Sequence, residues 1–146
     1  METISDYMTR HHRDCDDAFA RAEAAAATSD WAGLERDAGM FLREMVRHIG
    51  LEENLLFPAF EKRTGMMSGP TEMMRMEHEQ MRSMFAQMRA AIDAKDAEQY
   101  LGLSETLLVL LQQHNMKEES MMYPMLDQSL GEEANNLLAQ MENLTV

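Results

Sequence analysis

Apolar residues recur at spacings of three and four over four long segments of the chain, and short polar stretches separate these segments. Residues three and four apart lie on one face of an α-helix, so the spacing is typical of amphipathic helices. Nothing in the chain shows the alternation of a half-buried strand. The pattern predicts helices over about 5–27, 30–63, 70–94 and 96–128, and a short fifth helix after Gly131.

Local residues mark where these helices begin and bend. The Ser-Asp pair at 29–30 can cap the second helix, and Pro70 follows a loop at a position suited to the first residue of the third. Asp96 followed by Gln99 predicts a capping box for the fourth. Pro58 should kink the second helix, because proline removes one backbone amide. The short connections predict an all-α fold, an antiparallel up-down-up-down four-helix bundle with a short C-terminal helix.

Composition narrows the class of protein. The chain carries 13 Lys and Arg against 26 Asp and Glu, a net charge of -13, which disfavours binding to nucleic acid or anionic membranes. The single Cys15 cannot form an internal disulfide, and neither a signal peptide nor a membrane-spanning run is evident. We therefore expect one domain over residues 1–146, in a cytoplasmic protein without a nucleic-acid or membrane partner.

Two stretches share one pattern: HIGLEENLLFP begins at His48 and HNMKEESMMYP begins at His114. A helical residue four places on lies about 40° from the first, whereas one five places on lies about 140° away. Glu52 should therefore share a face with His48, and Glu118 with His114. The same geometry turns the following residues toward solvent or a flanking helix, namely Glu53 and Glu119.

The histidines of different helices should lie at one level of the bundle. His12 lies 16 positions before Thr28, and His48 lies 18 positions after Asp30, or about 24 and 27 Å at about 1.5 Å per residue. These lengths agree within one helical turn. The same count applied to the second pair of helices aligns His78 with His114.

Four imidazoles and two carboxylates on inward faces predict a buried metal site. Their burial without a compensating positive charge would be very costly, because the flanking residues are apolar. Imidazole and carboxylate ligands suit divalent transition metals, and a pair of ions about 3.5 to 4 Å apart would satisfy this set. Glu52 and Glu118 would then bridge the two ions.

The order of these residues is also a family signature. It consists of a histidine, a His-x-x-x-Glu pair, another histidine and a second pair, formed by His12, His48, Glu52, His78, His114 and Glu118. This order, with an aromatic-proline pair after each His-x-x-x-Glu, resembles the hemerythrin-like HHE cation-binding domain over nearly the whole chain. The resemblance implies two non-haem iron ions in a four-helix bundle, bridged by oxo, hydroxo or water, with these six residues as metal ligands.

Two positions depart from hemerythrin proper. That protein has His-x-x-x-His on its third helix, whereas this chain has Met74 four residues before His78. A thioether is a poor ligand for iron beside carboxylates, so the departure weakens the interpretation as an oxygen carrier. Hemerythrin proper also places its second carboxylate five residues after the histidine, where this chain has Glu119. We expect Glu118 to be the ligand from the angle argument and keep Glu119 as the alternative.

Several nearby residues have other expected roles. His11 lies about 100° around the helix from His12, so both cannot point at one centre, and we assign His12. Asp16 could accept the other ring proton of His12 or be exposed. Cys15 is expected to be a small core residue, and Tyr123 to pack in the core, with a hydrogen bond near the site as the alternative.

The resemblance and the residues together favour a protein that binds a small diatomic gas, O2 or NO, at the di-iron centre. The first alternative is an enzyme that uses the same irons, such as a peroxidase, an oxidase or a reductase of NO or O2. The second is an iron-handling, iron-repair or sensory module. No further acid, base or substrate pocket is evident in the sequence, so we rank gas binding above the enzyme.

Overall fold

The computed structural model describes residues 2–143, and every element within that range is helical. The elements are α1 (Ile4–Ala27), α2 (Trp31–Leu51), η1 (Glu52–Leu56), α3 (Phe57–Thr64), α4 (Pro70–Asp93), α5 (Ala97–Lys117), η2 (Glu118–Met122), α6 (Tyr123–Leu130) and α7 (Glu133–Asn143). The two elements η1 and η2 are π-helical turns that join their neighbours without a break. None of the described helices combines the length and apolarity needed to cross a membrane.

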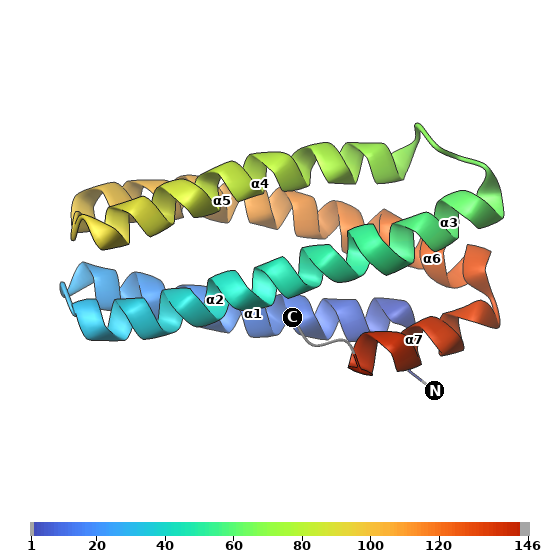
Figure 1. Cartoon of the computed structure of the whole chain (residues 1–146), viewed down its shortest axis with the longest axis horizontal. Helices are drawn as coiled ribbons and strands as arrows, with labels where there is room; N and C mark the ends of the chain where they lie inside the picture. Colours follow the sequence, from blue (N-terminus) through green and yellow to red (C-terminus); the bar gives the residue numbers. More distant parts are fainter. Residues whose placement is uncertain (1, 144–146) are drawn as a thin grey trace.

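The elements form the predicted antiparallel bundle. Helices α1 and α2 make one hairpin and α4 and α5 make the other, and the short turns of both hairpins lie at the same end (Figure 1). At the opposite end α3 extends α2 and α6 extends α5, so each of these arms is one long irregular helix. Helix α5 returns beside α1, which closes the bundle.

A side-chain cap marks the start of α2 and of α5, the second helix of each hairpin. The carboxylate of Asp30 accepts a hydrogen bond from the amide of Gly33, and that of Asp96 accepts one from the amide of Gln99, each at 3.0 Å. The amide of Asp96 itself donates to the carbonyl of Ala91 at 2.9 Å. The cap at Asp96 is therefore confirmed, whereas the reciprocal half of the predicted capping box does not form.

The irregularity predicted at Pro58 takes the form of a π turn rather than a simple kink. In η1 the amide of Phe57 donates to the carbonyl of Glu52, five residues earlier. The wider turn lets the helix pass a residue that has no amide and whose ring would crowd the carbonyl four residues before it. The second HNMKEESMMYP stretch repeats this arrangement at 118–122. Each π turn begins at the glutamate of a His-x-x-x-Glu pair.

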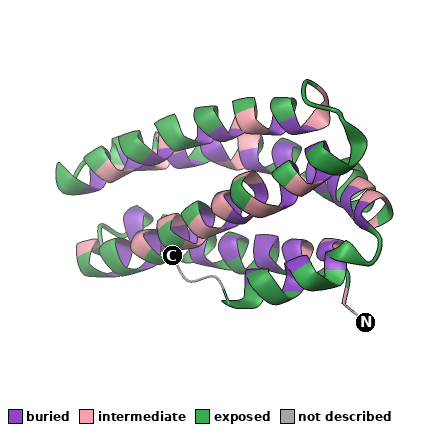
Figure 2. Cartoon of the chain, turned by 45° about the vertical axis from the view of Figure 1, so that its right-hand side comes forward, coloured by how far each residue is buried: buried purple, intermediate pink, exposed green. Residues whose placement is uncertain are grey.

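Buried residues line the inner faces of all the long helices (Figure 2). They separate into two apolar clusters. The first apolar cluster fills the end with the hairpin turns and contains Phe41 and Phe85, and the second contains Phe57, Phe60 and Leu126 at the end with α3 and α6. Between the two clusters, each long arm presents a histidine, so the polar centre is enclosed by apolar residues on both sides.

Helix α7 lies against the side of the bundle near the N-terminus of α1 (Figure 1). Its residues Leu137 and Met141 join the second apolar cluster. The guanidinium of Arg47 in α2 donates to the carbonyl of Met141 at 3.1 Å and to the hydroxyl of Tyr7 at 2.9 Å. The predicted short C-terminal helix is thus present and packs on the second apolar cluster.

Candidate metal centre

The structure brings together all six side chains that the sequence singled out. They form two groups of four, and within each group the potential ligand atoms lie within 4.8 Å of one another. Glu52 and Glu118 belong to both groups and are fully buried. The first group adds His12 and His48, and the second group adds His78 and His114.

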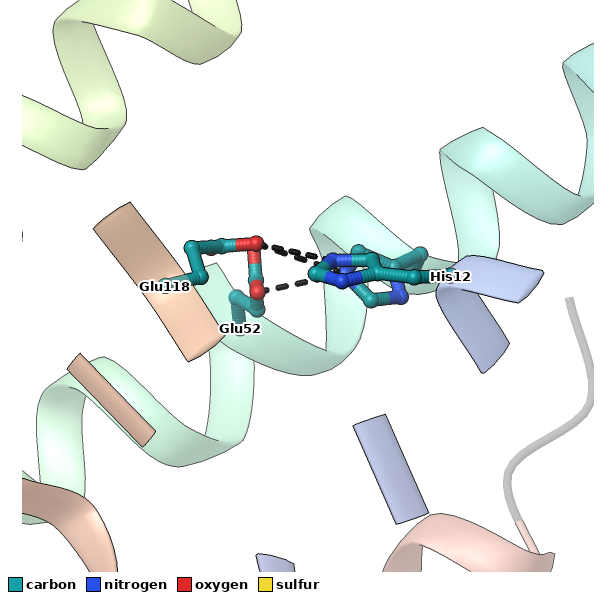
Figure 3. A group of neighbouring side chains, drawn as sticks. His12, Glu52 and Glu118 are labelled. Atoms are coloured by element: carbon teal, nitrogen blue, oxygen red, sulfur yellow. Dashed lines mark hydrogen bonds and ion pairs between the residues drawn. The ribbon is translucent and has the colours of Figure 1, made fainter. Parts of the chain in front are cut away.

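The first group combines the histidines of α1 and α2 with both glutamates. Nε2 of His12 lies 3.0 Å from Oε1 of Glu118, and Nε2 of His48 lies 3.2 Å from Oε2 of Glu52. Both carboxylates point toward His12 (Figure 3). The four side chains are between 0% and 3% exposed, so water has almost no access to them.

The second group contains polar atoms without hydrogen-bond partners. Nε2 of His78 lies 2.9 Å from Oε1 of Glu52, and Nε2 of His114 lies 3.3 Å from Oε2 of Glu118. Neither pair is aligned as a hydrogen bond, and among the described residues all four atoms lack a hydrogen-bond partner. Buried polar atoms are rarely left unpaired, so four of them facing one another indicate a site for a cation.

Three of the four histidines are oriented by carboxylates on their outer side. The Nδ1 atom of each lies 2.7 Å from a carboxylate oxygen, in the pairs His12 with Glu119, His78 with Glu53, and His114 with Glu77. A carboxylate accepts, so the network assigns the ring proton to Nδ1. In the neutral ring the unprotonated Nε2 then faces the centre, as a metal ligand must.

His48 is oriented by another histidine. Nε2 of His11 lies 2.7 Å from a carboxylate oxygen of Glu44, which places the proton of His11 on Nε2. Nδ1 of His11 therefore accepts from Nδ1 of His48, at 3.1 Å. Although His11 does not point at the centre, it fixes the ring of His48 with Nε2 turned inward.

The buried carboxylates of the centre favour positive charge on two of the histidines. Burial disfavours a charged imidazole, yet the carboxylates of Glu52 and Glu118 outweigh it and raise the pKa of His48 to about 10. The same balance, with Glu118 as the main partner, raises the pKa of His114 to about 9. Burial and the two carboxylates raise the pKa of the Tyr123 hydroxyl well above its usual range. In the absence of metal, protons on His48 and His114 supply positive charge beside the carboxylates.

These observations fit a pair of transition-metal ions. Nitrogen from imidazole and oxygen from carboxylate is the ligand set of divalent iron, zinc, copper or nickel, whereas calcium and magnesium sites are built from oxygen. The first group would hold one ion and the second group the other, with one oxygen of each glutamate available to either ion.

Comparison with known families agrees with this chemistry. The family model of the hemerythrin HHE cation binding domain matches residues 3–126, which include every residue of both groups. The chain belongs to the hemerythrin HHE cation-binding domain family. No curated protein and no solved structure gave a match. Membership of the HHE family agrees with a role of the centre in binding metal cations.

Some predicted contacts of this HHE domain differ in the structure. Glu119 is not in either group, because its carboxylate binds the outer nitrogen of His12. It takes the role that Asp16 was considered for, and Asp16 is exposed. Burial raises the pKa of the Cys15 thiol to about 12, which agrees with the expected core position. Tyr123 is buried among the ligand atoms, so the alternative of a hydrogen bond near the site is the better description.

None of the residues that orient the histidines was predicted to do so from the sequence. They share one property, adjacency to a predicted ligand in the chain: His11, Glu53, Glu77 and Glu119. A helical neighbour lies about 100° around the axis, so it points sideways at the next helix rather than into the centre. This offset indicates that such a residue can reach a neighbouring helix, but which side chain it contacts there depends on how the helices pack.

Proposed function

We propose that the chain holds two iron ions and binds a small diatomic gas, O2 or NO, at them. His12 and His48 would bind one ion, His78 and His114 the other, and Glu52 and Glu118 both. The observation that carries the proposal is the set of four facing, unpaired ligand atoms of the second group, with two fully buried carboxylates shared between groups. Bound iron supplies open coordination positions and reversible one-electron chemistry.

The protein's own residues prepare the ligands and keep water away. The hydrogen bonds to Nδ1 hold each Nε2 toward the centre, so little reorganisation is needed when a metal binds. The first and second apolar clusters enclose the centre from both ends of the bundle. A dry, enclosed site favours a small apolar ligand over hydrolytic reactions, which need water.

The size of the site also supports a diatomic ligand. The six predicted ligands are between 0% and 3% exposed, so a large substrate has no direct path to them. A cleft of about 470 Å³ lies outside the centre between α1 and α5, with Asp16 and Glu119 in its wall. Glu119 lines this cleft and also contacts the outer nitrogen of His12, so the cleft ends next to the centre.

Metal analysis of the protein purified from its own cells, followed by titration of the reduced protein with NO, tests the proposal. We expect about two irons per chain and a change in visible absorption that saturates with NO. Zinc or manganese in place of iron, or no response to NO, would contradict it. Continuous consumption of NO or peroxide by the reduced protein would instead favour the enzyme.

A matched pair of variants ties the response to the centre. Glu118→Ala removes a shared carboxylate and should abolish both the second iron and the NO response. Glu105→Ala removes an exposed carboxylate from the same helix and should change neither.

A further inference from the structure

The hydroxyl oxygen of Tyr123 lies among the ligand atoms of the first group. It is 2.6 Å from Oε2 of Glu52 and 2.8 Å from Oε1 of Glu118. It is also 3.0 Å from Nε2 of His12 and 3.1 Å from Nε2 of His48. The side chain is fully buried. The oxygen therefore touches one inward-facing atom of every residue in that group.

Ordinary hydrogen bonding does not satisfy this arrangement. A hydroxyl has one proton to donate, and the two carboxylates can only accept. In the neutral rings that a metal requires, the proton of His12 and of His48 is on Nδ1, so both Nε2 atoms are acceptors as well. One proton thus faces four acceptors, and a buried acceptor without a donor is costly. A cation among these five oxygen and nitrogen atoms would interact favourably with all of them.

The repeated stretch shows what the position requires for packing alone. In HIGLEENLLFP the place of Tyr123 is taken by Phe57, which is also fully buried. The Phe57 ring stacks on His78, with ring centroids 6.0 Å apart and an angle of 8° between the planes. A phenyl ring is therefore sufficient for packing behind a His-x-x-x-Glu pair, and the hydroxyl of Tyr123 is an addition confined to the first group.

We propose that Tyr123 is a metal ligand, with its phenolate oxygen as the fifth protein donor to the ion of the first group. The inference rests on the iron pair proposed above. The hydroxyl proton passes to solvent as the ion binds, and the second group keeps four donors. The two ions are therefore unequal, and the position open to a diatomic ligand lies on the ion held by His78 and His114.

Iron loading with a spectroscopic readout tests the role of Tyr123. The metal-free protein is loaded with Fe²⁺ without oxygen, oxidised with ferricyanide and desalted, and bound iron is then counted. We expect a broad visible band from charge transfer between phenolate and ferric iron. Resonance Raman excitation in that band should enhance the ring vibrations of tyrosine. Tyr123→Phe should lose the band and these vibrations while the chain still folds and binds iron, because phenylalanine keeps the ring.

Tyr100→Phe is the matched control. Tyr100 is equally buried, and among the described residues its oxygen has no hydrogen-bond partner. It belongs to the first apolar cluster, so removal of its hydroxyl should leave the band unchanged. Retention of the band in Tyr123→Phe, or iron-loaded wild type without tyrosine vibrations, would overturn the assignment and leave the iron pair intact. Wild type that binds no iron would overturn the proposed function as well, and the iron count separates the two failures.

Discussion

Nδ1 of His12 lies 2.7 Å from a carboxylate oxygen of Glu119, although 107 positions separate the two residues in the chain. A similar contact to the outer nitrogen of a histidine joins each neighbouring pair of the four long helical arms, which contain α1, α2, α4 and α5. A residue next to a ligand on one arm holds the histidine of the following arm, from α1 to α2, to α4, to α5 and back to α1. These four contacts form a closed ring around the centre.

The two consecutive glutamates of η2 should give different losses when each is replaced by alanine. Glu118→Ala removes an atom from both groups, so we expect one iron per chain or none. Glu119→Ala removes only the partner of His12, so the iron count should persist at saturation while affinity falls about 10- to 100-fold. Iron analysis and competition with a chelator measure the two effects. An empty Glu119→Ala protein beside a filled Glu118→Ala protein would reverse the assignment.

His11 should affect metal affinity without touching the metal. In His11→Phe the outer nitrogen of His48 loses its acceptor, so the ring can adopt the wrong tautomer or rotate. We expect affinity at the first group to fall about 10- to 100-fold. Glu44→Gln should have a smaller effect, because the amide oxygen still accepts from His11. Equal losses in the two variants, in the same chelator competition, would contradict this order.

Metal affinity should rise with pH above neutrality. The pKa of His48 is about 10 and that of His114 about 9 in the metal-free chain, so a binding ion must displace a proton from each. Competition by one proton at the second group predicts about a tenfold gain in affinity per pH unit from pH 7 to about 9. The first group should depend on pH more steeply, because its ion also displaces the Tyr123 proton. Anaerobic chelator competition with Fe²⁺ at several pH values measures it. A flat profile over this range would show that neither histidine is protonated.

The stability of the metal-free chain should change in the opposite direction. Both histidines have folded-state pKa values above the usual 6.5. Their contribution to the free energy of unfolding is therefore complete below pH 6.5 and is lost as pH rises to about 9 or 10. We expect the melting temperature to fall over this window after chelation and to fall less with bound metal, which replaces the protons. Thermal unfolding followed by circular dichroism, with and without metal, tests both parts.

Met74→His tests whether a further imidazole can join the second group. Met74 is fully buried and lies one helical turn before His78. Without metal, the new imidazole should cost about 1 to 3 kcal/mol, because it lacks a partner. With iron bound the cost should be smaller, and dioxygen binding should become reversible. Met74→Leu is the control for packing. If Met74→His lowers the melting temperature relative to Met74→Leu by the same amount with and without iron, the imidazole does not reach the ion.

The sequence predicted the bundle and its six central residues because both depend on local periodicity. Spacing by four places Glu52 beside His48 on one helix face, and helix length sets the level of each histidine. The contacts of Glu53 and Glu77 depend instead on how two helices are rotated against each other, which no single-helix pattern contains. The π turns were missed for a related reason. Pro58 indicates that the backbone must deviate but does not specify how.

The ring of contacts has a consequence for folding order. Its closing link joins α1 to η2, close to opposite ends of the sequence, so neither hairpin can complete either group by itself: each group draws residues from both sides of the bundle. Tight binding of the ions therefore requires that the two hairpins have already docked. Metal uptake during refolding would report a late event, slower than the formation of the helices, and iron-bound chains would be those that have finished assembly.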